Sequence, residues 1–336
     1  MTLSPAMRAA PFTLDRFILE EQRFSPGSTG ELSLLLLRLG VAAKRIAAAL
    51  AGAGLSQSLG SAGSSNVQGE EQKKLDVLAN DILLETFDYG GLVSLAASEE
   101  MEEPVVYGGR LAEGRYAVLF DPMDGSSNID VNGTLGTIFS IRRRRDGTVA
   151  DLLRPGHEQV AAGYILFGPA VLLVYTCGDG VHLFTLDPAI GEFLLTRRDV
   201  RMPDRGKGYA VNEGRAHSWA PGVRAFVEHL KEPDKASGRP YSTRYSASLV
   251  ADVHRFLLEG GIYLYPADAA GKGAGKLRVL YECHPLALVV EQAGGKASTG
   301  TARVLDVAPA ALHERMPLAI GSRAEVELFE KFVARG

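Results

Sequence analysis

The stretch FDPMDGSSNID, residues 120–130, decides the organisation of this chain. The apolar run just before it, residues 116–120, is typical of a buried strand, and it ends in carboxylates, a glycine, hydroxyls and an amide. Pro122 fixes its own φ between Asp121 and Asp124, so both carboxylates can turn toward one point beyond the strand end. Hard oxygen ligands suit Mg²⁺ or Mn²⁺, and the glycine and serines that follow can donate to an anion. The sequence therefore predicts that a metal and a phosphate share this loop.

A second acidic pair follows another predicted strand. Residues 92–97 have a strand pattern and run directly into Glu99 and Glu100. Either acidic pair alone is as well explained by a helix cap or an ordinary turn. Four acids brought together without metal would repel one another and take up protons, so the combination predicts bound cations. Two or more divalent cations about 4 Å apart can bind the attacking water and the leaving oxygen of a phosphate ester at once.

Length and composition narrow the class of protein. A chain of 336 residues predicts two domains, and 46% hydrophobic with 23% charged residues is typical of a globular protein. The net charge of −4 argues against a nucleic-acid partner, and we interpret the basic run 142–145 as a solvated or small-anion-binding strand end. Cys177 and Cys283 lie far apart without metal-type spacing, so we expect a reduced cytoplasmic protein in which each is a core residue.

Two features argue against secretion and membrane insertion. The first residues carry charges and no adjoining apolar segment, so no secretory signal is expected. The most apolar stretch, residues 34–50, is interrupted by Arg38, Lys44 and Arg45. This pattern predicts a packed helix and no membrane span.

The N-terminal third predicts two long helices separated by a glycine-rich loop. Ser28 and Glu31 have the spacing of a capping box, and apolar residues continue at helical spacing to Leu50. Residues 52–69 contain glycines and serines typical of a mobile loop. The segment QKKLDVLANDILLETF, residues 72–87, predicts the next helix, with an apolar face that includes Leu78 and with Asp76 on another face.

The rest of the chain predicts a sheet followed by an α/β region. GTIFSIRRR at residues 136–144 is a strand, and residues 160–196 predict a meander of antiparallel strands. A charged, proline-containing segment at 197–208 marks a boundary, so we expect domains at 1–199 and 200–336. The second domain predicts helices at 221–230, 247–258, 286–293 and 324–334, alternating with strands at 262–265, 277–281 and 318–320.

Eight motifs carry a resemblance to a known family. They are DPMDGSSNID, ASEE, VQGEEQKKLDVLAND, NEG, RYSASLVADVH, GGIYLYP, GKLRVLYEC and EQAGGKA. Together they resemble the class I fructose-1,6-bisphosphatases of the lithium-sensitive phosphatase superfamily, over residues 14–336. The resemblance implies an α/β fold, a layered α/β/α/β/α sandwich called the sugar-phosphatase fold, and a homotetramer built from dimers. It also implies hydrolysis of fructose 1,6-bisphosphate to fructose 6-phosphate and phosphate.

The resemblance assigns metal-binding and catalytic roles by position. It implies two or more Mg²⁺ ions per subunit, with Mn²⁺ as an alternative. The implied ligands are Glu99, Glu100, Asp121, Asp124, Glu282 and the carbonyl of Met123. The implied catalytic groups are Asp76, which would orient or deprotonate water with help from Glu100, and Glu70 on the mobile loop.

The resemblance also assigns substrate contacts. The reacting 1-phosphate would lie against Gly125, Ser126 and Ser127, and Lys276 and Arg278 would lie at the sugar end. The implied 6-phosphate contacts are Asn212, Tyr245 and Tyr265, with Arg244 reaching the neighbouring subunit's substrate. Independent chemistry agrees, because arginine and tyrosine donors suit phosphate oxygens.

Two positions depart from the family pattern. Glu70 replaces an aspartate on the mobile loop of animal members, which keeps the carboxylate and adds a methylene. Arg215 follows NEG where many members have tyrosine, so a cation replaces one hydroxyl contact to the 6-phosphate. That exchange leaves activity on the seven-carbon sedoheptulose 1,7-bisphosphate open.

A regulatory site is implied at the turn STGE. A helix N-terminus presents unpaired N–H groups and suits a phosphate, and the resembling family binds the inhibitor AMP there. The alternative is a plain capped helix, because Ser33 and Arg115 replace the commoner Thr and Lys. The matching positions are Thr29, Gly30, Glu31, Ser33, Arg115, Tyr116 and Arg143. Residues 146–160 are short and lack cysteine, which argues against control by thioredoxin.

Two competing functions fit less well. A non-catalytic sensor of sugar phosphate or AMP would be expected to have lost Asp76 or a strand-end carboxylate, and none is lost. An inositol monophosphatase would have no need of a second phosphate pocket around Tyr245 and Tyr265. The sequence leaves open the metal used in the cell, the strength of AMP inhibition, and a role in gluconeogenesis or in the Calvin cycle.

Overall fold

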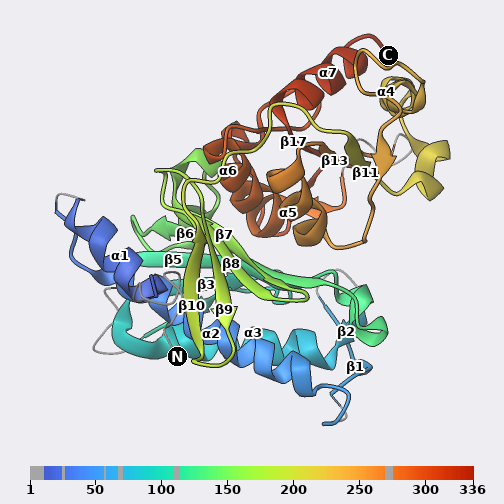
Figure 1. The fold of residues 1–336 in the computed structure, drawn as a ribbon. Coiled ribbons are helices and arrows are strands. Elements are labelled where there is room, and N and C mark those ends of the chain that lie inside the picture. Colours follow the sequence, from blue (N-terminus) through green and yellow to red (C-terminus); the bar gives the residue numbers. More distant parts are fainter. Residues whose placement is uncertain (1–10, 25–26, 57, 67–70, 109–113, 269–274) are drawn as a thin grey trace, which may run out of the picture.

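The fold has five layers, in which helices alternate with two sheets (Figure 1). This computed structural model describes residues 11–24, 27–56, 58–66, 71–108, 114–268 and 275–336. Helices α1, α2 and α3 cover one face of the larger sheet, and α5 and α6 lie between the two sheets. Helices α4 and α7 cover the far face of the smaller sheet. The predicted α/β/α/β/α sandwich is therefore confirmed. The helices are α1 (Leu14–Arg23), α2 (Glu31–Gly52), α3 (Lys74–Asp88), α4 (Pro221–Lys231), α5 (Leu249–Glu259), α6 (His284–Gln292) and α7 (Arg323–Val333).

The larger sheet has eight strands in the order β10-β9-β8-β7-β6-β5-β3-β4. All neighbours are antiparallel except β3 and β5, which run parallel. The predicted meander is confirmed as β7 to β10. The strands are β3 (Val93–Ser98), β4 (Val105–Val106), β5 (Tyr116–Asp124), β6 (Leu135–Arg143), β7 (Gln159–Phe167), β8 (Val171–Thr176), β9 (His182–Asp187) and β10 (Glu192–Arg197).

The smaller sheet has five strands in the order β12-β11-β13-β17-β15. Its strands are β11 (Gly208–Ala210), β12 (Ser242–Thr243), β13 (Ile262–Tyr265), β15 (Lys296–Ser298) and β17 (Leu318–Gly321). Two short pairs complete the strands, β1 (Ser61–Ser65) with β2 (Glu71–Lys73) and β14 (Leu277–Arg278) with β16 (Arg315–Met316). The chain passes from the larger to the smaller sheet across residues 198–207, where we propose the boundary between domains 1–199 and 200–336.

Short helical turns connect these elements. Those near the site are η3 (Ser126–Val131), η6 (Glu213–Ser218) and the π-helix η7 (Val279–Cys283). The others are η2 (Tyr89–Gly91), η4 (Val149–Leu152), η5 (Gly156–Glu158) and η8 (Val304–Asp306). In the described residues, no helix is both long and apolar enough to span a bilayer.

The larger sheet separates two apolar cores because side chains alternate along each strand. In β6, Phe139 and Ile141 pack toward α1, α2 and α3, while Ile138 packs toward α5 and α6. Such strands are buried on both faces, which explains the nearly continuous apolar runs in their sequence.

Several local predictions were wrong at the level of single residues. The capping box is not formed, since α2 begins at Glu31 after Gly30, whose φ is 82° and which has no side-chain cap. On α3 it is Leu78 that is 38% exposed, whereas Asp76 is buried. Part of the predicted loop 52–69 pairs as β1, and the predicted strand 277–281 becomes β14 followed by η7.

Two predictions about burial were also wrong. Arg142, which we placed in a solvated run, is fully buried and donates to the carbonyls of Arg154 and Pro155, both at 3.0 Å. Backbone oxygens accept from Nη1, and Nη2 lies 3.1 Å from His284 Nδ1, so two of its three nitrogens have partners that offset the cost of burial. Cys283 is a core residue as predicted, but Cys177 is exposed.

Candidate active site

The parallel pairing of β3 with β5 brings the two acidic strand ends together. Ser98 is level with Phe120, and the N–H of Glu99 donates to the Phe120 carbonyl at 3.0 Å. Parallel strands present their carboxyl ends at the same edge of a sheet. Glu99 and Asp121 therefore leave the sheet next to each other.

Three of the predicted ligands form a buried carboxylate cluster. Oxygen atoms of Asp121, Asp124 and Glu282 lie within 4.8 Å of one another, and none of these residues is more than 8% exposed. Burial raises the pKa of Asp121, and the charges of Glu99, Asp124 and Glu282 raise it further. Burial also raises the pKa of Asp124. Clustered oxygen ligands that resist ionisation fit a divalent cation, whose charge would offset their repulsion.

Glu282 reaches the cluster from a distant part of the chain through the π-helix η7. The wider turn of η7 lies between β14 and α6, and its Glu282 is 4% exposed. The Arg278 N–H donates to Glu282 Oε2 at 2.6 Å, which fixes the carboxylate. Single π-helical turns occur often at functional sites, and this one directs an acid toward β5.

Arg278 lies with the carboxylates. Its guanidinium is 2.7 Å from Glu99 Oε1 and 4.0 Å from Glu282 Oε2, and Arg278 is 7% exposed. Burial raises the pKa of Glu99, and the Arg278 charge opposes that rise. The structure thus places Arg278 against the metal-binding end, where we had expected a contact at the sugar end.

Asp124 links the cluster to the helix layer between the sheets. Its carboxylate accepts from the Ser248 hydroxyl at 2.7 Å and from the N–H groups of Leu249 at 3.1 Å and Val250 at 2.8 Å. These N–H groups belong to the first turn of α5, which attracts a negative charge through its unpaired donors and its dipole. Asp124 is therefore a helix cap as well as a candidate ligand.

Asp76 is held at the start of α3 with one oxygen unused. The Lys73 N–H donates to Asp76 Oδ2 at 2.8 Å, while Oδ1 is buried and has no hydrogen-bond partner among the described residues. Burial raises the pKa of Asp76 to about 7, the Lys73 N–H opposes the rise, and the Glu100 charge adds to it. Glu100 is itself held by Gln72, whose Nε2 donates to Glu100 Oε2 at 2.7 Å. A carboxylate with these properties suits proton transfer near neutral pH.

The predicted phosphate loop turns directly after Asp124. Gly125 has a φ of 77°, and a Cβ there would lie 2.8 Å from the Ser248 side chain, so only glycine fits. Ser126 and Ser127 begin η3, and the N–H groups of a helix's first turn have no partner within the helix. Met123 is buried, and its N–H donates to Asp121 Oδ1 at 2.9 Å.

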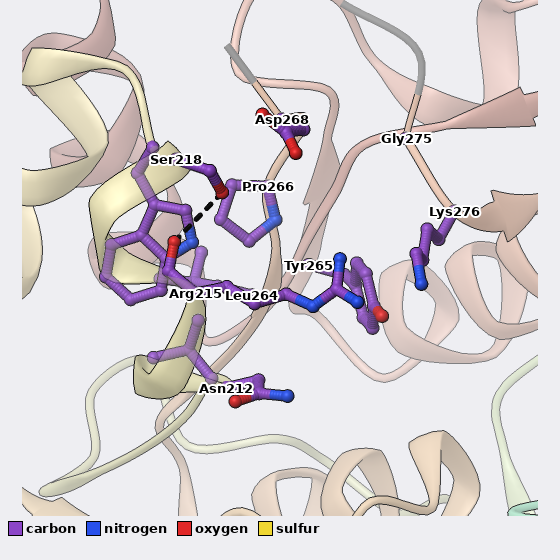
Figure 2. A pocket seen from close by; sticks show the side chains of 11 residues that line it. Asn212, Arg215, Ser218, Leu264, Tyr265, Pro266, Asp268, Gly275 and Lys276 are labelled. Carbon is purple, nitrogen blue, oxygen red and sulfur yellow. Dashed lines mark hydrogen bonds between the residues drawn. The ribbon is translucent and has the colours of Figure 1, made fainter. Parts of the chain in front are cut away.

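A pocket of about 170 Å³ brings together three of the six residues predicted at the sugar and 6-phosphate end (Figure 2). Asn212, Tyr265 and Lys276 line it together with Arg215. Tyr245 does not line this pocket; burial raises its pKa, and the neighbouring Asn212 side chain lowers it. The side chains come from η6, β13 and the segment before β14, which are far apart in sequence.

Two predicted site residues lie apart from this group. Arg244 is exposed, donates to the Thr243 carbonyl at 2.8 Å, and lines a different, basic pocket with Lys207 and Lys235. Glu70 lies outside the described residues.

The residues predicted to bind AMP meet at the N-terminus of α2. Six of the seven line a pocket of about 250 Å³, beside Gln22 and Cys177. The seventh, Glu31, does not line the pocket and pairs with Arg115 at 3.4 Å. Ser33 donates to Gln22 Oε1 at 2.8 Å. The six lining residues are Thr29, Gly30, Ser33, Arg115, Tyr116 and Arg143.

Sequence reasoning missed two residues that orient the acids. Gln72 and Ser248 hold Glu100 and Asp124 respectively. Ser248 had a local signal, because a serine just before a helical apolar pattern indicates an N-cap, and its hydroxyl does accept from the Ala251 N–H. Gln72 had no such signal, since its partner lies 28 residues further along the chain.

The comparisons with known proteins agree with this arrangement. The five layers, with acids at the end of a parallel strand pair, define the sugar-phosphatase fold. The family model described as fructose-1-6-bisphosphatase, N-terminal domain, matches residues 12–198, and that described as the C-terminal domain matches residues 202–334. The chain belongs to the fructose-1,6-bisphosphatase family, which is metal-dependent.

Individual relatives match over nearly the whole chain. The class 1 fructose-1,6-bisphosphatase of Chloroherpeton thalassium is 50% identical over 95% of this chain and 93% of its own length. That of Chlorobium luteolum is 49% identical over 95% of this chain and 97% of its own. The crystal structure of holo Leishmania major fructose-1,6-bisphosphatase has a TM-score of 0.91 at 38% identity, covering 97% of this chain and all of that one.

Proposed function

We propose that this protein hydrolyses fructose 1,6-bisphosphate to fructose 6-phosphate and phosphate in carbohydrate metabolism. The single observation that carries the proposal is the buried cluster of Asp121, Asp124 and Glu282, whose oxygens lie within 4.8 Å of one another. The chain belongs to the fructose-1,6-bisphosphatase family, and this membership identifies fructose 1,6-bisphosphate as the proposed substrate. The substrate's 1-phosphate would lie at the cluster, and the 6-phosphate in the pocket of Asn212 and Tyr265.

The cluster is the proposed site of Mg²⁺, with Mn²⁺ as an alternative. Asp121, Asp124 and Glu282 would hold one ion, and Glu99, Glu100 and the Met123 carbonyl are the proposed ligands of further ions. Bound divalent cations stabilise charge on phosphoryl oxygens and lower the pKa of bound water. Arg278 now neutralises Glu99, so an additional ion there would share Glu99 with that guanidinium.

Residues of this chain have separate proposed roles in the hydrolysis. Asp76 accepts the proton of the attacking water at Oδ1, with Oδ2 fixed by the Lys73 N–H. Glu100, held by Gln72, orients that water, and Glu70, which lies outside the described residues, is the remaining proposed catalytic group. N–H and hydroxyl groups of Gly125, Ser126 and Ser127 bind the transferring phosphoryl oxygens.

Regulation and assembly are finer parts of the same proposal. AMP would bind at the N-terminus of α2, where Arg115, Tyr116 and Arg143 line the pocket, and would inhibit the enzyme. The protein would act in the cytoplasm as a homotetramer in which Arg244, exposed on its own subunit, reaches a neighbour's substrate. Its place in gluconeogenesis or in the Calvin cycle would follow from relative rates on the six- and seven-carbon bisphosphates.

The test is phosphate release from fructose 1,6-bisphosphate in the presence of Mg²⁺. We expect turnover that chelation abolishes and that Asp121→Ala reduces at least a thousandfold, about 4 kcal/mol of transition-state stabilisation. Asp204→Ala removes an exposed acid and is the matched control, with unchanged turnover. Wild-type protein without turnover, or an Asp121→Ala variant near wild-type rates, would show the proposal to be wrong.

A further inference from the structure

His313 lies on the turn before β16 and contacts the acidic turn that follows β3. Its Nε2 lies 2.9 Å from the carbonyl oxygen of Met101, 212 residues away in the sequence. Because a carbonyl oxygen can only accept, Nε2 carries the hydrogen and donates it. Met101 directly follows Glu99 and Glu100, so this hydrogen bond ties the C-terminal domain to the turn that carries two proposed metal ligands.

Met101 is also held by α3, on which the proposed proton acceptor lies. Asn80 Nδ2 lies 3.7 Å from Met101 Sδ, and Asn80 stands one helical turn after Asp76. Within the acidic turn, the Met101 N–H donates to the Ser98 carbonyl at 3.3 Å. Met101 is therefore placed between the helix that carries Asp76 and the segment that carries His313.

The segment of His313 also fixes the start of the π-helix η7. The Val279 N–H donates to the Glu314 carbonyl at 2.8 Å, and β16 pairs with β14 just before η7. The ring of His313 lies 5.3 Å from the ring of Tyr281, which is fully buried and directly precedes Glu282. His313 thus contacts both acid-bearing turns, the one after β3 and η7.

The sheet alone leaves the acidic turn after β3 incompletely fixed. The pairing of β3 with β5 ends at Ser98 and Phe120, and the Glu99 N–H continues it by donating to the Phe120 carbonyl. Glu100 and Met101 lie past these paired residues. Carboxylates brought together repel one another until a cation binds, and this repulsion acts to separate turns that no sheet joins. The contacts of His313 oppose that separation.

We infer that His313 is a positioning residue for metal binding, which holds the turn after β3 against η7 so that Glu100 and Glu282 keep their spacing. The inference rests on the proposed function. Two divalent cations about 4 Å apart need ligands from separate segments at a fixed distance. Groups that hold metal ligands in place typically change metal affinity or activity ten- to a hundredfold when removed. His313 acts through the Met101 carbonyl and the Tyr281 ring.

Two substitutions separate the hydrogen bond of His313 from its packing. His313→Leu keeps an apolar side chain against Tyr281 but cannot donate to Met101, whereas His313→Gln keeps an N–H donor of similar reach. Calorimetric titration without substrate measures Mg²⁺ binding, and circular dichroism measures the folded fraction. We expect the dissociation constant of Mg²⁺ to rise about tenfold in His313→Leu and to stay within about twofold of wild type in His313→Gln.

Hydrolysis of fructose 1,6-bisphosphate gives a second readout. At a Mg²⁺ concentration equal to the wild-type dissociation constant, the rate of His313→Leu should fall about fivefold, and more Mg²⁺ should restore it. KM for the bisphosphate should stay within about twofold, because neither His313 nor Met101 lines the substrate pocket of Asn212 and Tyr265. A merely structural role would lower the rate by the same factor at every Mg²⁺ concentration, together with the folded fraction.

His157→Leu is the matched control, because this exposed histidine also lies beside a carbonyl, that of Leu305 at 3.2 Å, and outside both acid-bearing turns. We expect it to keep the wild-type Mg²⁺ affinity and rate. Unchanged Mg²⁺ affinity in His313→Leu, or equal losses in His313→Leu and His313→Gln, would overturn the role of His313. A wild type that bound Mg²⁺ without hydrolysing the bisphosphate would instead overturn the proposed function, and the calorimetry would still decide the role of His313.

Discussion

The two ends of the candidate site differ in burial and in charge. At one end, Asp121, Asp124 and Glu282 are buried acids held by strands and helices of the core. At the other, Arg215 is an exposed cation on a short helical turn. Buried acids cost folding free energy unless a cation offsets them, while exposed cations cost little. We expect the chemistry to depend on the core and substrate selection to depend on surface turns.

The largest predicted effect on stability distinguishes two acids, Asp124 and Asp121, at the buried end of the site. Asp124→Ala removes the acceptor of three hydrogen bonds and should lower the free energy of unfolding by about 3 kcal/mol, because buried donors of α5 lose their partner. Asp121→Asn removes a carboxylate whose pKa is raised by burial and should leave that free energy unchanged or higher. Both should abolish turnover. Urea unfolding without divalent cations measures the difference, and equal stabilities for the two variants would break the distinction.

Burial also predicts acid sensitivity at His254 in the middle helix layer. Burial lowers the pKa of His254 to about 4, with Arg197 and Arg255 adding to the shift, and the Tyr164 hydroxyl lies 2.8 Å from Nδ1. The unfolded chain takes up this proton below pH 6.5, so the folded state loses about 1.4 kcal/mol per pH unit down to about pH 4.

A variant isolates this contribution from other titrating groups. His254→Gln should show a shallower fall in the free energy of unfolding between pH 6.5 and 4.5 than wild type, by about 2 kcal/mol over the whole range. Urea unfolding at several pH values measures both slopes. Parallel slopes would contradict the effect of burial on this histidine.

Cation binding should distinguish the two ends of the site. Mg²⁺ at a hundred times its dissociation constant should raise the free energy of unfolding by about 2.7 kcal/mol. The rise should disappear in Asp121→Asn and persist in Arg215→Gln, since only the first residue belongs to the carboxylate cluster. Thermal unfolding with and without Mg²⁺ measures it. If Arg215→Gln also lost the effect, the two ends would not be independent.

The smallest expected effect concerns the pocket at α2. Arg143→Gln should raise the AMP concentration for half inhibition about tenfold, or about 1.4 kcal/mol, through loss of one charged phosphate contact. Arg145→Gln, at the same strand exit but paired with Glu158 at 2.7 Å, is the matched control. AMP inhibition unaffected by Arg143→Gln and by Tyr116→Ala would remove the proposed regulatory site.

The sequence predicted the elements better than it predicted which residues they bury. Strand periodicity in residues 116–120 and in the meander, and helical spacing in α2 and α3, were sufficient because they are local patterns. Burial was harder to predict, since it depends on partners remote in sequence. Arg142 is buried because its guanidinium donates to the carbonyls of Arg154 and Pro155. Asp76 is buried because α3 packs the side of the helix that carries it against the rest of the fold.

By itself, the sequence determined that acids follow two strands and that a glycine–serine turn comes after one of them. Only the tertiary structure decided that β3 and β5 pair in parallel, which brings those acids to one edge. It also decided that Glu282 arrives through η7 and that Asp124 caps α5. The physical reason is that turns and periodicity are set by neighbouring residues, whereas strand pairing, helix docking and the pKa shifts of buried acids arise from contacts between separate segments. Ser98 and Phe120 are 22 residues apart, and Asp124 and Leu249 are 125 residues apart.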